Sequence, residues 1–134
     1  RLLVEQGYAW HMDDFSDDLP RWEAVEMADG ATEPLVCVPY ALDTNDMKFW
    51  TAPGYTPAQW LDYARASFDW MLAESRELGP RMLSVGLHLR IIGRPGRIGA
   101  LDAFLEHVTG REDVWIATRG DIARRFAECV PWSR

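Results

Sequence analysis

The sequence is poor in cysteine and lacks any long apolar run. Its 134 residues include only two cysteines, Cys37 and Cys129, which lie far apart and form no CxxC motif. Cys37 lies within the apolar run 35–38. A thiol in such a run is usually a small buried hydrophobic group rather than a disulfide or redox partner. No segment approaches the roughly 18 apolar residues of a membrane span, which argues against a membrane partner.

Positive charge is also scarce. Lysine and arginine number 14 against 21 acidic residues, which gives a net charge of -7. Nucleic acids and anionic membranes both require a positive binding surface, so the sequence predicts neither as a partner. No signal-peptide pattern occurs at the start, and we expect a reduced protein in the cytoplasm. The hydrophobic fraction of 48% is sufficient for one compact domain.

The first residues lack the usual features of a domain start. The run 1–6 (RLLVEQ), followed by Gly7, is typical of the last turns of a helix that ends at a glycine. A natural domain seldom begins partway along a helix. We therefore expect an N-terminal portion upstream of Arg1.

Short apolar or aromatic runs predict strands at residues 8–12, 35–39, 82–87 and 114–117. The second of these is apolar on both faces, which is typical of a buried and usually parallel sheet. Residues 23–33 are polar and punctuated by glycine, and no strand is predicted there.

Helical spacing of apolar residues predicts helices over 57–78, 98–108 and 121–129, with Trp60 and Phe68 among the core residues of the first. Strands that alternate with helices imply parallel pairing through right-handed crossovers. A complete (β/α) barrel typically needs about 200 residues or more. The predicted strands are roughly half of such a barrel, and upstream sequence or a second chain would complete it.

In (β/α) barrels, catalytic residues collect where strands end and loops begin. The first candidate cluster follows residues 8–12 and comprises His11, Asp13, Asp14, Asp17 and Asp18. Carboxylates beside a histidine can bind a metal or orient a base. The alternative is a solvated acidic loop in which the aspartates form turns.

His88 is the second candidate, because it ends the apolar run 82–87. A histidine at that place can serve as general acid or base, since imidazole ionises near neutral pH. A half-buried histidine that is held by a backbone group is an equally open alternative.

The third candidate is an arginine-rich loop that contains Arg90, Arg94 and Arg97 in an otherwise acidic chain. At a helix N-terminus, such a loop can hold a carboxylate or a urea oxygen. It can equally be a solvated turn whose arginines brace the scaffold. Trp22, beside the acidic loop, suits the wall of a pocket for a small planar ligand or a sugar, although packing explains it equally well.

Several segments together resemble one family. Residues 17–22 (DDLPRW), 38–47 (VPYALDTNDM) and 84–97 (SVGLHLRIIGRPGR) resemble, in this order, three segments of the allantoinase-like branch of the polysaccharide deacetylases. Val114-Trp115 and residues 121–124 resemble its closing VW…DIAR. The resemblance covers nearly the whole chain.

This resemblance implies an α/β fold, in which residues 1–134 form the C-terminal half of a single distorted (β/α) barrel of the NodB-homology type. It also implies that His88 is the catalytic acid, although the family pattern Leu-x-His is here a directly adjacent Leu87-His88. Asn45 and Asp46 would orient loops or substrate. The implied substrate-binding residues are Asp17, Asp18, Trp22, Arg90 and Arg94.

The implied function is part of a hydrolase of non-peptide C–N bonds, with a cyclic amide or ureide such as allantoin as its small-molecule substrate. One alternative is a deacetylase of N-acetylated sugars, and another is a non-catalytic truncated homologue that acts as a structural subunit. The family's metal ligands and catalytic aspartate belong to N-terminal motifs, so no metal ligand is assigned in this chain. A divalent metal such as zinc would be held by the upstream half. Higher oligomers are common in this branch, and residues 40–56 could serve such contacts.

Overall fold

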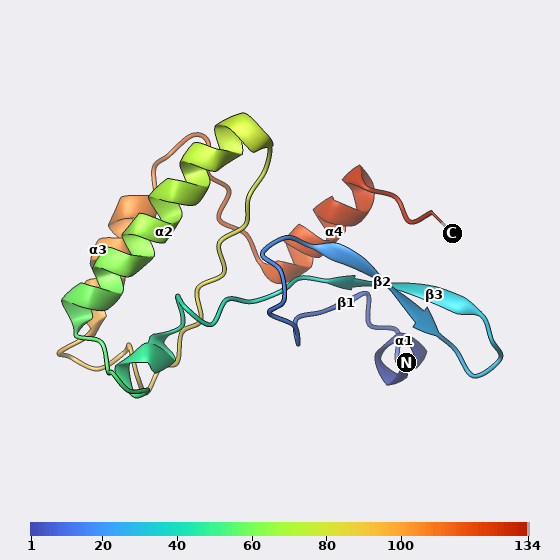
Figure 1. Cartoon of the computed structure of the whole chain (residues 1–134), viewed down its shortest axis with the longest axis horizontal. Helices are drawn as coiled ribbons and strands as arrows, with labels where there is room; N and C mark the ends of the chain where they lie inside the picture. The colour runs from blue at the N-terminus through green and yellow to red at the C-terminus, as the bar shows by residue number, and fades with distance from the viewer. Residues whose placement is uncertain (134) are drawn as a thin grey trace. The chain divides into compact units, whose positions relative to one another are not determined.

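The computed structural model describes residues 1–133, which form two compact units. The sheet unit comprises residues 1–40 together with the segment from Ala117 onwards, and the helical unit comprises residues 41–116. Figure 1 shows the elements of both units. Among the described residues, no helix is long and apolar enough to cross a membrane.

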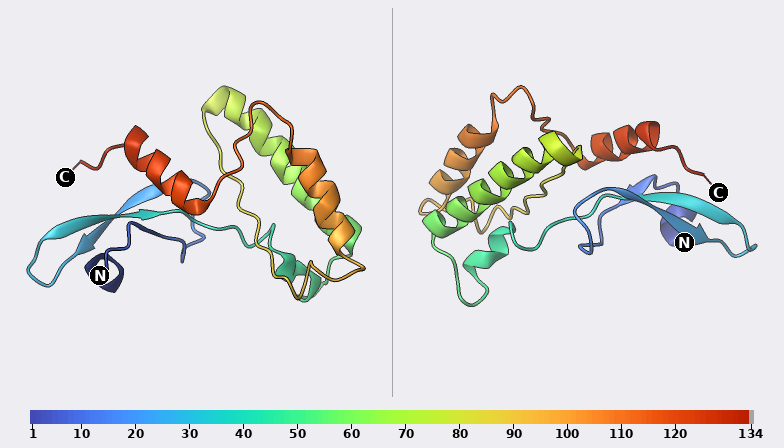
Figure 2. Two further views of the ribbon diagram at one scale, coloured as in Figure 1. Left: turned by 180° about the vertical axis from the view of Figure 1, so that it is seen from behind. Right: turned by 45° about the horizontal axis from the view of Figure 1, so that its top comes forward.

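The sheet unit is built on three strands in the order β1-β3-β2. β1 (Trp10–His11) pairs in parallel with β3 (Thr32–Cys37), whereas β2 (Arg21–Glu26) pairs with β3 in the antiparallel direction. Figure 2 shows that β2 and β3 form a hairpin. Its turn contains Gly30, whose φ of 80° lies in the left-handed region that favours glycine.

Two helices belong to the sheet unit. α1 (Leu2–Glu5) ends just before Gly7, whose φ is 77°, so the predicted helix end is confirmed. α4 (Arg119–Cys129) begins two residues before the predicted start, because the Thr118 side chain accepts a hydrogen bond from the Asp121 backbone and caps the helix there. α4 packs against β3.

In the helical unit, α2 (Pro57–Leu78) lies beside α3 (Ile98–Val108), as Figure 1 shows. Both helices have the predicted bounds. α2 begins at a capping box in which Thr56 and Gln59 exchange hydrogen bonds. The indole of Trp60 is buried against Phe104 of α3, with ring centroids 5.9 Å apart. A short 3-10 helix, η1 (Asp46–Phe49), precedes α2.

The strand prediction is wrong at three places. Residues 82–87 and 114–117 pair with no strand within the described part of the chain, and residues 21–26 form a strand that was not predicted. A strand needs a neighbour for its backbone groups, and sequence periodicity does not reveal that neighbour. The parallel pairing of the buried run 35–37 with the first strand is confirmed.

Candidate active site

A buried carboxylate holds His88 in the helical unit. Oδ1 of Asp46 lies 2.7 Å from Nδ1 of His88. Oδ2 of Asp46 accepts hydrogen bonds from the backbone N–H groups of His88, at 2.7 Å, and Ile92, at 3.2 Å. The Asp46 side chain is completely buried, whereas 39% of the His88 side chain is exposed. Asp46 therefore fixes both the ring and the backbone of His88.

This arrangement sets the direction in which the imidazole can exchange a proton. An ionised carboxylate only accepts hydrogen bonds, so Nδ1 of His88 carries the hydrogen that faces Asp46. Nε2 has no hydrogen-bond partner among residues 1–133. The ring is thus anchored through one nitrogen, and the other can donate or accept a proton.

The segment before Asp46 packs closely against the segment before His88. Thr44 donates from its hydroxyl to the Ser84 carbonyl at 2.5 Å, and the Asp46 N–H donates to the Gly86 carbonyl at 2.9 Å. A Cβ at Gly86 would collide with the side-chain amide of Asn45. Oδ1 of Asn45 accepts from the Met47 N–H at 2.9 Å and caps η1. The Thr44–Asp46 segment and the glycine before His88 therefore form one local structure.

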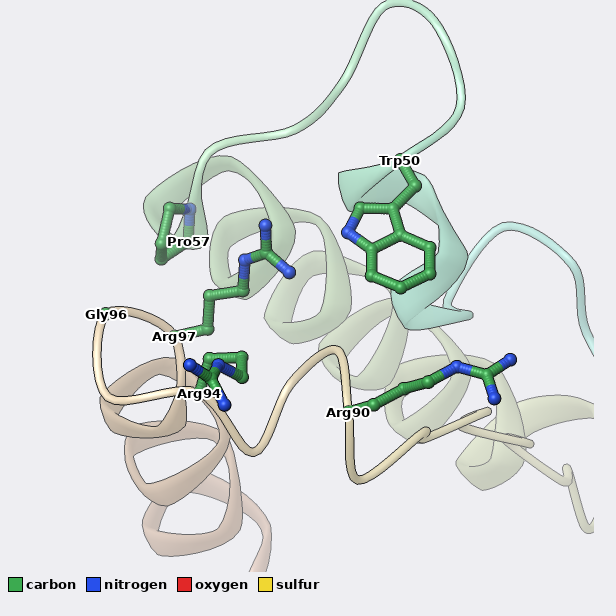
Figure 3. A pocket seen from close by; sticks show the side chains of 6 residues that line it. All are labelled: Trp50, Pro57, Arg90, Arg94, Gly96 and Arg97. Atoms are coloured by element: carbon green, nitrogen blue, oxygen red, sulfur yellow. The ribbon is translucent and has the colours of Figure 1, made fainter.

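An open pocket of about 480 Å³ lies on the helical unit, and Figure 3 shows its lining. Arg90, Arg94 and Arg97 of the loop before α3 line it, together with Trp50, Pro57 and Gly96.

The three arginines of this pocket differ in what they contact. Arg97 stacks on the Phe49 ring at 4.8 Å and donates to the Ile91 carbonyl at 3.3 Å, so it braces the scaffold. The side chains of Arg90 and Arg94 form no hydrogen bond or ion pair with any described residue. Two guanidinium groups are therefore available to a ligand with oxygen acceptors.

The other predicted substrate-binding residues belong to the sheet unit. Asp17 and Asp18 are exposed, and the Asp17 carboxylate accepts a hydrogen bond from the Asp18 N–H at 2.7 Å. Trp22 packs against Phe126 and Trp132, each with ring centroids 5.8 Å from its own. These contacts give Trp22 a packing role, and substrate binding by the three residues stays a prediction.

In the acidic loop, the Asp13 backbone N–H donates to Nδ1 of His11 at 3.4 Å, but no carboxylate of the loop is hydrogen-bonded to the ring within the described part of the chain. Hydrogen bonds from Ser16, with an ion pair to Arg21 at 3.0 Å, lower the pKa of Asp14 to about 2. The His11 ring instead contacts Glu23, with Nε2 2.8 Å from Oε2. His11, Glu23 and Cys37 each place one potential ligand atom within 4.8 Å of the others. Sequence spacing does not reveal this group, because its members come from three different strands.

No family model matches the chain. A Schizosaccharomyces pombe protein assigned as a polysaccharide deacetylase is 42% identical over 125 residues, which make up 90% of this chain and 39% of that protein.

Two crystal structures match 98% of this chain and 43% of their own chains. One is assigned as a polysaccharide deacetylase from Pseudomonas aeruginosa PAO1, with a TM-score of 0.87 and 38% identity. The other is Puue allantoinase, with a TM-score of 0.89 and 40% identity. The chain spans about two fifths of the length of these relatives.

The fold is α/β and matches part of NodB-type deacetylase and allantoinase structures. Over nearly its whole length the chain is homologous to part of the polysaccharide deacetylases, and it is related to deacetylase and allantoinase hydrolases. The family and the fold class predicted from the sequence are confirmed.

Proposed function

We propose that this chain is part of a hydrolase of non-peptide C–N bonds, and that its substrate is a cyclic ureide such as allantoin. The observation that carries the proposal is the contact of His88 with the buried Asp46, at 2.7 Å. General acid catalysis requires an imidazole that is held in one orientation with a free nitrogen. The likeness to an allantoinase supports the substrate class.

In the proposed reaction, an activated water attacks the carbonyl carbon, and a tetrahedral oxyanion forms. The C–N bond then breaks, and its electron pair passes to the leaving nitrogen. His88, in its protonated form, donates the Nε2 proton to that nitrogen. Protonation is needed because an amide nitrogen that leaves without a proton is a strong base.

Asp46 is a positioning residue in this scheme. Its buried carboxylate orients the ring through Nδ1 and stabilises the imidazolium that acts as the acid. The two backbone N–H groups on its other oxygen keep the carboxylate in place. The ring therefore does not need to reorient when the leaving nitrogen takes the proton.

Arg90 and Arg94 are proposed to bind oxygen atoms of the substrate. Hydrolysis of a cyclic ureide creates a carboxylate that stays attached to the product. A guanidinium group binds such a carboxylate in a charge-assisted, often bidentate manner. Both arginines lack a partner within the described part of the chain, and this supports an anionic product in the pocket.

The activity is proposed for a complete barrel. The chain corresponds to about two fifths of its relatives, and the catalytic base and any divalent metal would come from the remaining part of the fold. We propose that this part is upstream sequence or a second polypeptide, that copies of the protein form an oligomer in the cytoplasm, and that neither nucleic acid nor membrane is a partner. Asp17, Asp18 and Trp22 of the sheet unit are proposed as further substrate-binding residues.

A deacetylase of N-acetylated sugars is the second candidate. Two relatives assigned as polysaccharide deacetylases support it. The same His88 would then protonate a sugar amine, and free acetate would leave. A structural subunit without activity is the third candidate, and it requires that His88 contributes to no reaction.

The test compares two substrates with the chain alone and with the chain completed by the rest of the family fold. We expect the completed protein to open the ring of allantoin and to leave an N-acetylglucosamine oligomer intact, while the chain alone turns over neither. Release of acetate would instead support the deacetylase. No turnover of either substrate by a correctly folded complete protein would support the structural subunit.

A further inference from the structure

Three potential metal ligands lie on one face of the sheet. The register pairs Cys37 of β3 with His11 of β1 and with Arg21 of β2. Glu23 follows Arg21 by two residues, so both side chains lie on the same face of β2. Trp22 lies between them and packs on the other face, against Phe126 of α4. The ligand face is thus opposite to the face that contacts α4.

The atoms of this group are close enough to share one ion. Nε2 of His11 lies 2.8 Å from Oε2 of Glu23, and the ligand atoms of His11, Glu23 and Cys37 all lie within 4.8 Å of one another. Cys37 is completely buried, whereas 14% of the His11 side chain and 33% of the Glu23 side chain are exposed. A nitrogen, an oxygen and a sulfur donor are the ligands that zinc prefers.

We propose that His11, Glu23 and Cys37 form a three-ligand zinc site, with the fourth position open to solvent. The zinc ion takes the place of the hydrogen between Nε2 of His11 and Oε2 of Glu23. The imidazole then carries its hydrogen on Nδ1, and the 3.4 Å hydrogen bond that Nδ1 accepts from the Asp13 N–H is given up. The thiol of Cys37 binds as a thiolate, and its proton passes to the buffer.

The charges around the site are compatible with a dication. Arg21 lies beside the ligands, but it forms ion pairs at 3.0 Å with both Asp14 and Glu23. With zinc bound to one carboxylate and one thiolate, and with Arg21 opposite Asp14, the formal charges of the group cancel. Without zinc the group is left with one net negative charge. The buried Nη1 of Arg21 has no hydrogen-bond partner among the described residues, and an oxygen ligand on zinc would provide an acceptor for it.

The proposal is tested with cobalt(II) as an optical probe and zinc as its competitor, on the whole protein that carries this chain. A thiolate that binds cobalt gives a charge-transfer absorption band, which a carboxylate or imidazole ligand does not give. We expect the wild type to show this band and zinc to abolish it. Cys37→Ser is expected to remove the band, whereas the matched variant Cys129→Ser, at an exposed cysteine, is expected to retain it.

Glu23→Gln provides a second test that leaves the buried thiol in place. It removes one charged ligand at a half-buried position, and we expect zinc affinity to fall by about tenfold or more. Absence of the band in the wild type, its persistence in Cys37→Ser, or unchanged zinc affinity in Glu23→Gln would each overturn the proposal. Circular dichroism establishes that each variant is folded. None of these measurements depends on hydrolytic activity.

Discussion

The two units hold their histidines in different ways. In the helical unit, His88 contacts a carboxylate that is completely buried and that also accepts two backbone hydrogen bonds. In the sheet unit, His11 contacts Glu23, whose side chain is 33% exposed and is shared with Arg21. The first arrangement fixes a ring in one orientation, as proton transfer requires. The arrangement in the sheet unit leaves the Glu23 carboxylate free to exchange His11 or Arg21 for a ligand.

A third histidine, His107 of the helical unit, also contacts a carboxylate and can be compared with His88 and His11. Its Nε2 lies 2.8 Å from Oδ1 of Asp69, a distance like those of the other two histidines. The Asp69 side chain is 51% exposed, and it also contacts Arg111. A histidine–carboxylate contact alone therefore does not mark a site. Burial of the carboxylate distinguishes His88.

The largest expected effect is on activity. His88→Asn removes the proposed acid, and we expect kcat of the completed protein to fall by about 10²- to 10⁴-fold. His107→Asn is the matched control, because it breaks a surface histidine–carboxylate contact of similar length, and its kcat is expected to stay close to that of the wild type. Similar losses in both variants, measured by steady-state kinetics, would remove the distinction between the two histidines.

The next effect is on stability. Asp46→Ala leaves two backbone N–H groups and the His88 ring without their acceptor, and we expect the free energy of unfolding to fall by about 3 kcal/mol. Asp69→Ala removes only the exposed contacts with His107 and Arg111 and is expected to cost less than about 1 kcal/mol. Chemical denaturation measures both values. An equal fall in the free energy of unfolding in the two variants would show that burial of Asp46 adds nothing to stability.

Asp46→Asn separates positioning from folding. The amide oxygen can still accept from the backbone, so this variant is expected to stay folded, while the imidazolium loses its negative partner. We therefore expect kcat of the completed protein to fall, while KM and the free energy of unfolding change little, as steady-state kinetics and chemical denaturation would show. An unchanged kcat would show that Asp46 has only a structural role.

A smaller effect is expected at the arginine pocket. Arg90→Ala or Arg94→Ala each removes a guanidinium group without a protein partner, so KM is expected to rise about tenfold with little change in stability. Arg97→Ala is the matched variant, and it is expected to destabilise the helical unit because Arg97 stacks on Phe49. Unchanged KM in both Arg90 and Arg94 variants would contradict substrate binding by the loop.

The smallest effect is in the sheet unit. Hydrogen bonds from Ser16 and the ion pair with Arg21 lower the pKa of Asp14 from 3.8 to about 2. Because the pKa of Asp14 is lower in the folded protein, its ionised carboxylate stabilises the folded state at pH values above the unfolded pKa. This stabilisation is lost as the pH falls from about 4 towards 2. Ser16→Ala is expected to bring the pKa back towards 3.8, as an NMR titration would show. An unchanged pKa would contradict the role of Ser16.

The helices of this chain could be predicted from sequence because their signals are local. For α2, the amphipathic spacing, Thr56 at the cap, Pro57 and the closing Gly79 all lie within the segment itself. The strand Arg21–Glu26 is not apparent from the sequence, because its charged residues obscure the apolar alternation. Residues 82–87 were predicted as a strand from composition alone, but strand formation depends on a distant partner.

At the candidate site, too, local sequence signals could be predicted, whereas contacts between distant residues could not. His88 was identified from its place after an apolar run and from the family resemblance. Its dependence on Asp46 could not be predicted, because the two residues are 42 positions apart and a buried carboxylate has no local signature. Trp22 was predicted at a pocket, and its contacts with Phe126 and Trp132 come from residues more than a hundred positions away. Sequence thus indicates the reacting group better than the residues that hold it.

The central claim, that His88 protonates the leaving nitrogen, is tested most directly by varying the leaving group. The completed wild type and its His88→Asn variant are compared on an ordinary amide or ureide and on an activated aryl ester with the same acyl group, whose phenolate departs without a proton. We expect the variant to lose about 10²-fold or more in kcat/KM on the first substrate and little on the second. An equal loss on both substrates would contradict the claim, because His88 would then act at another step.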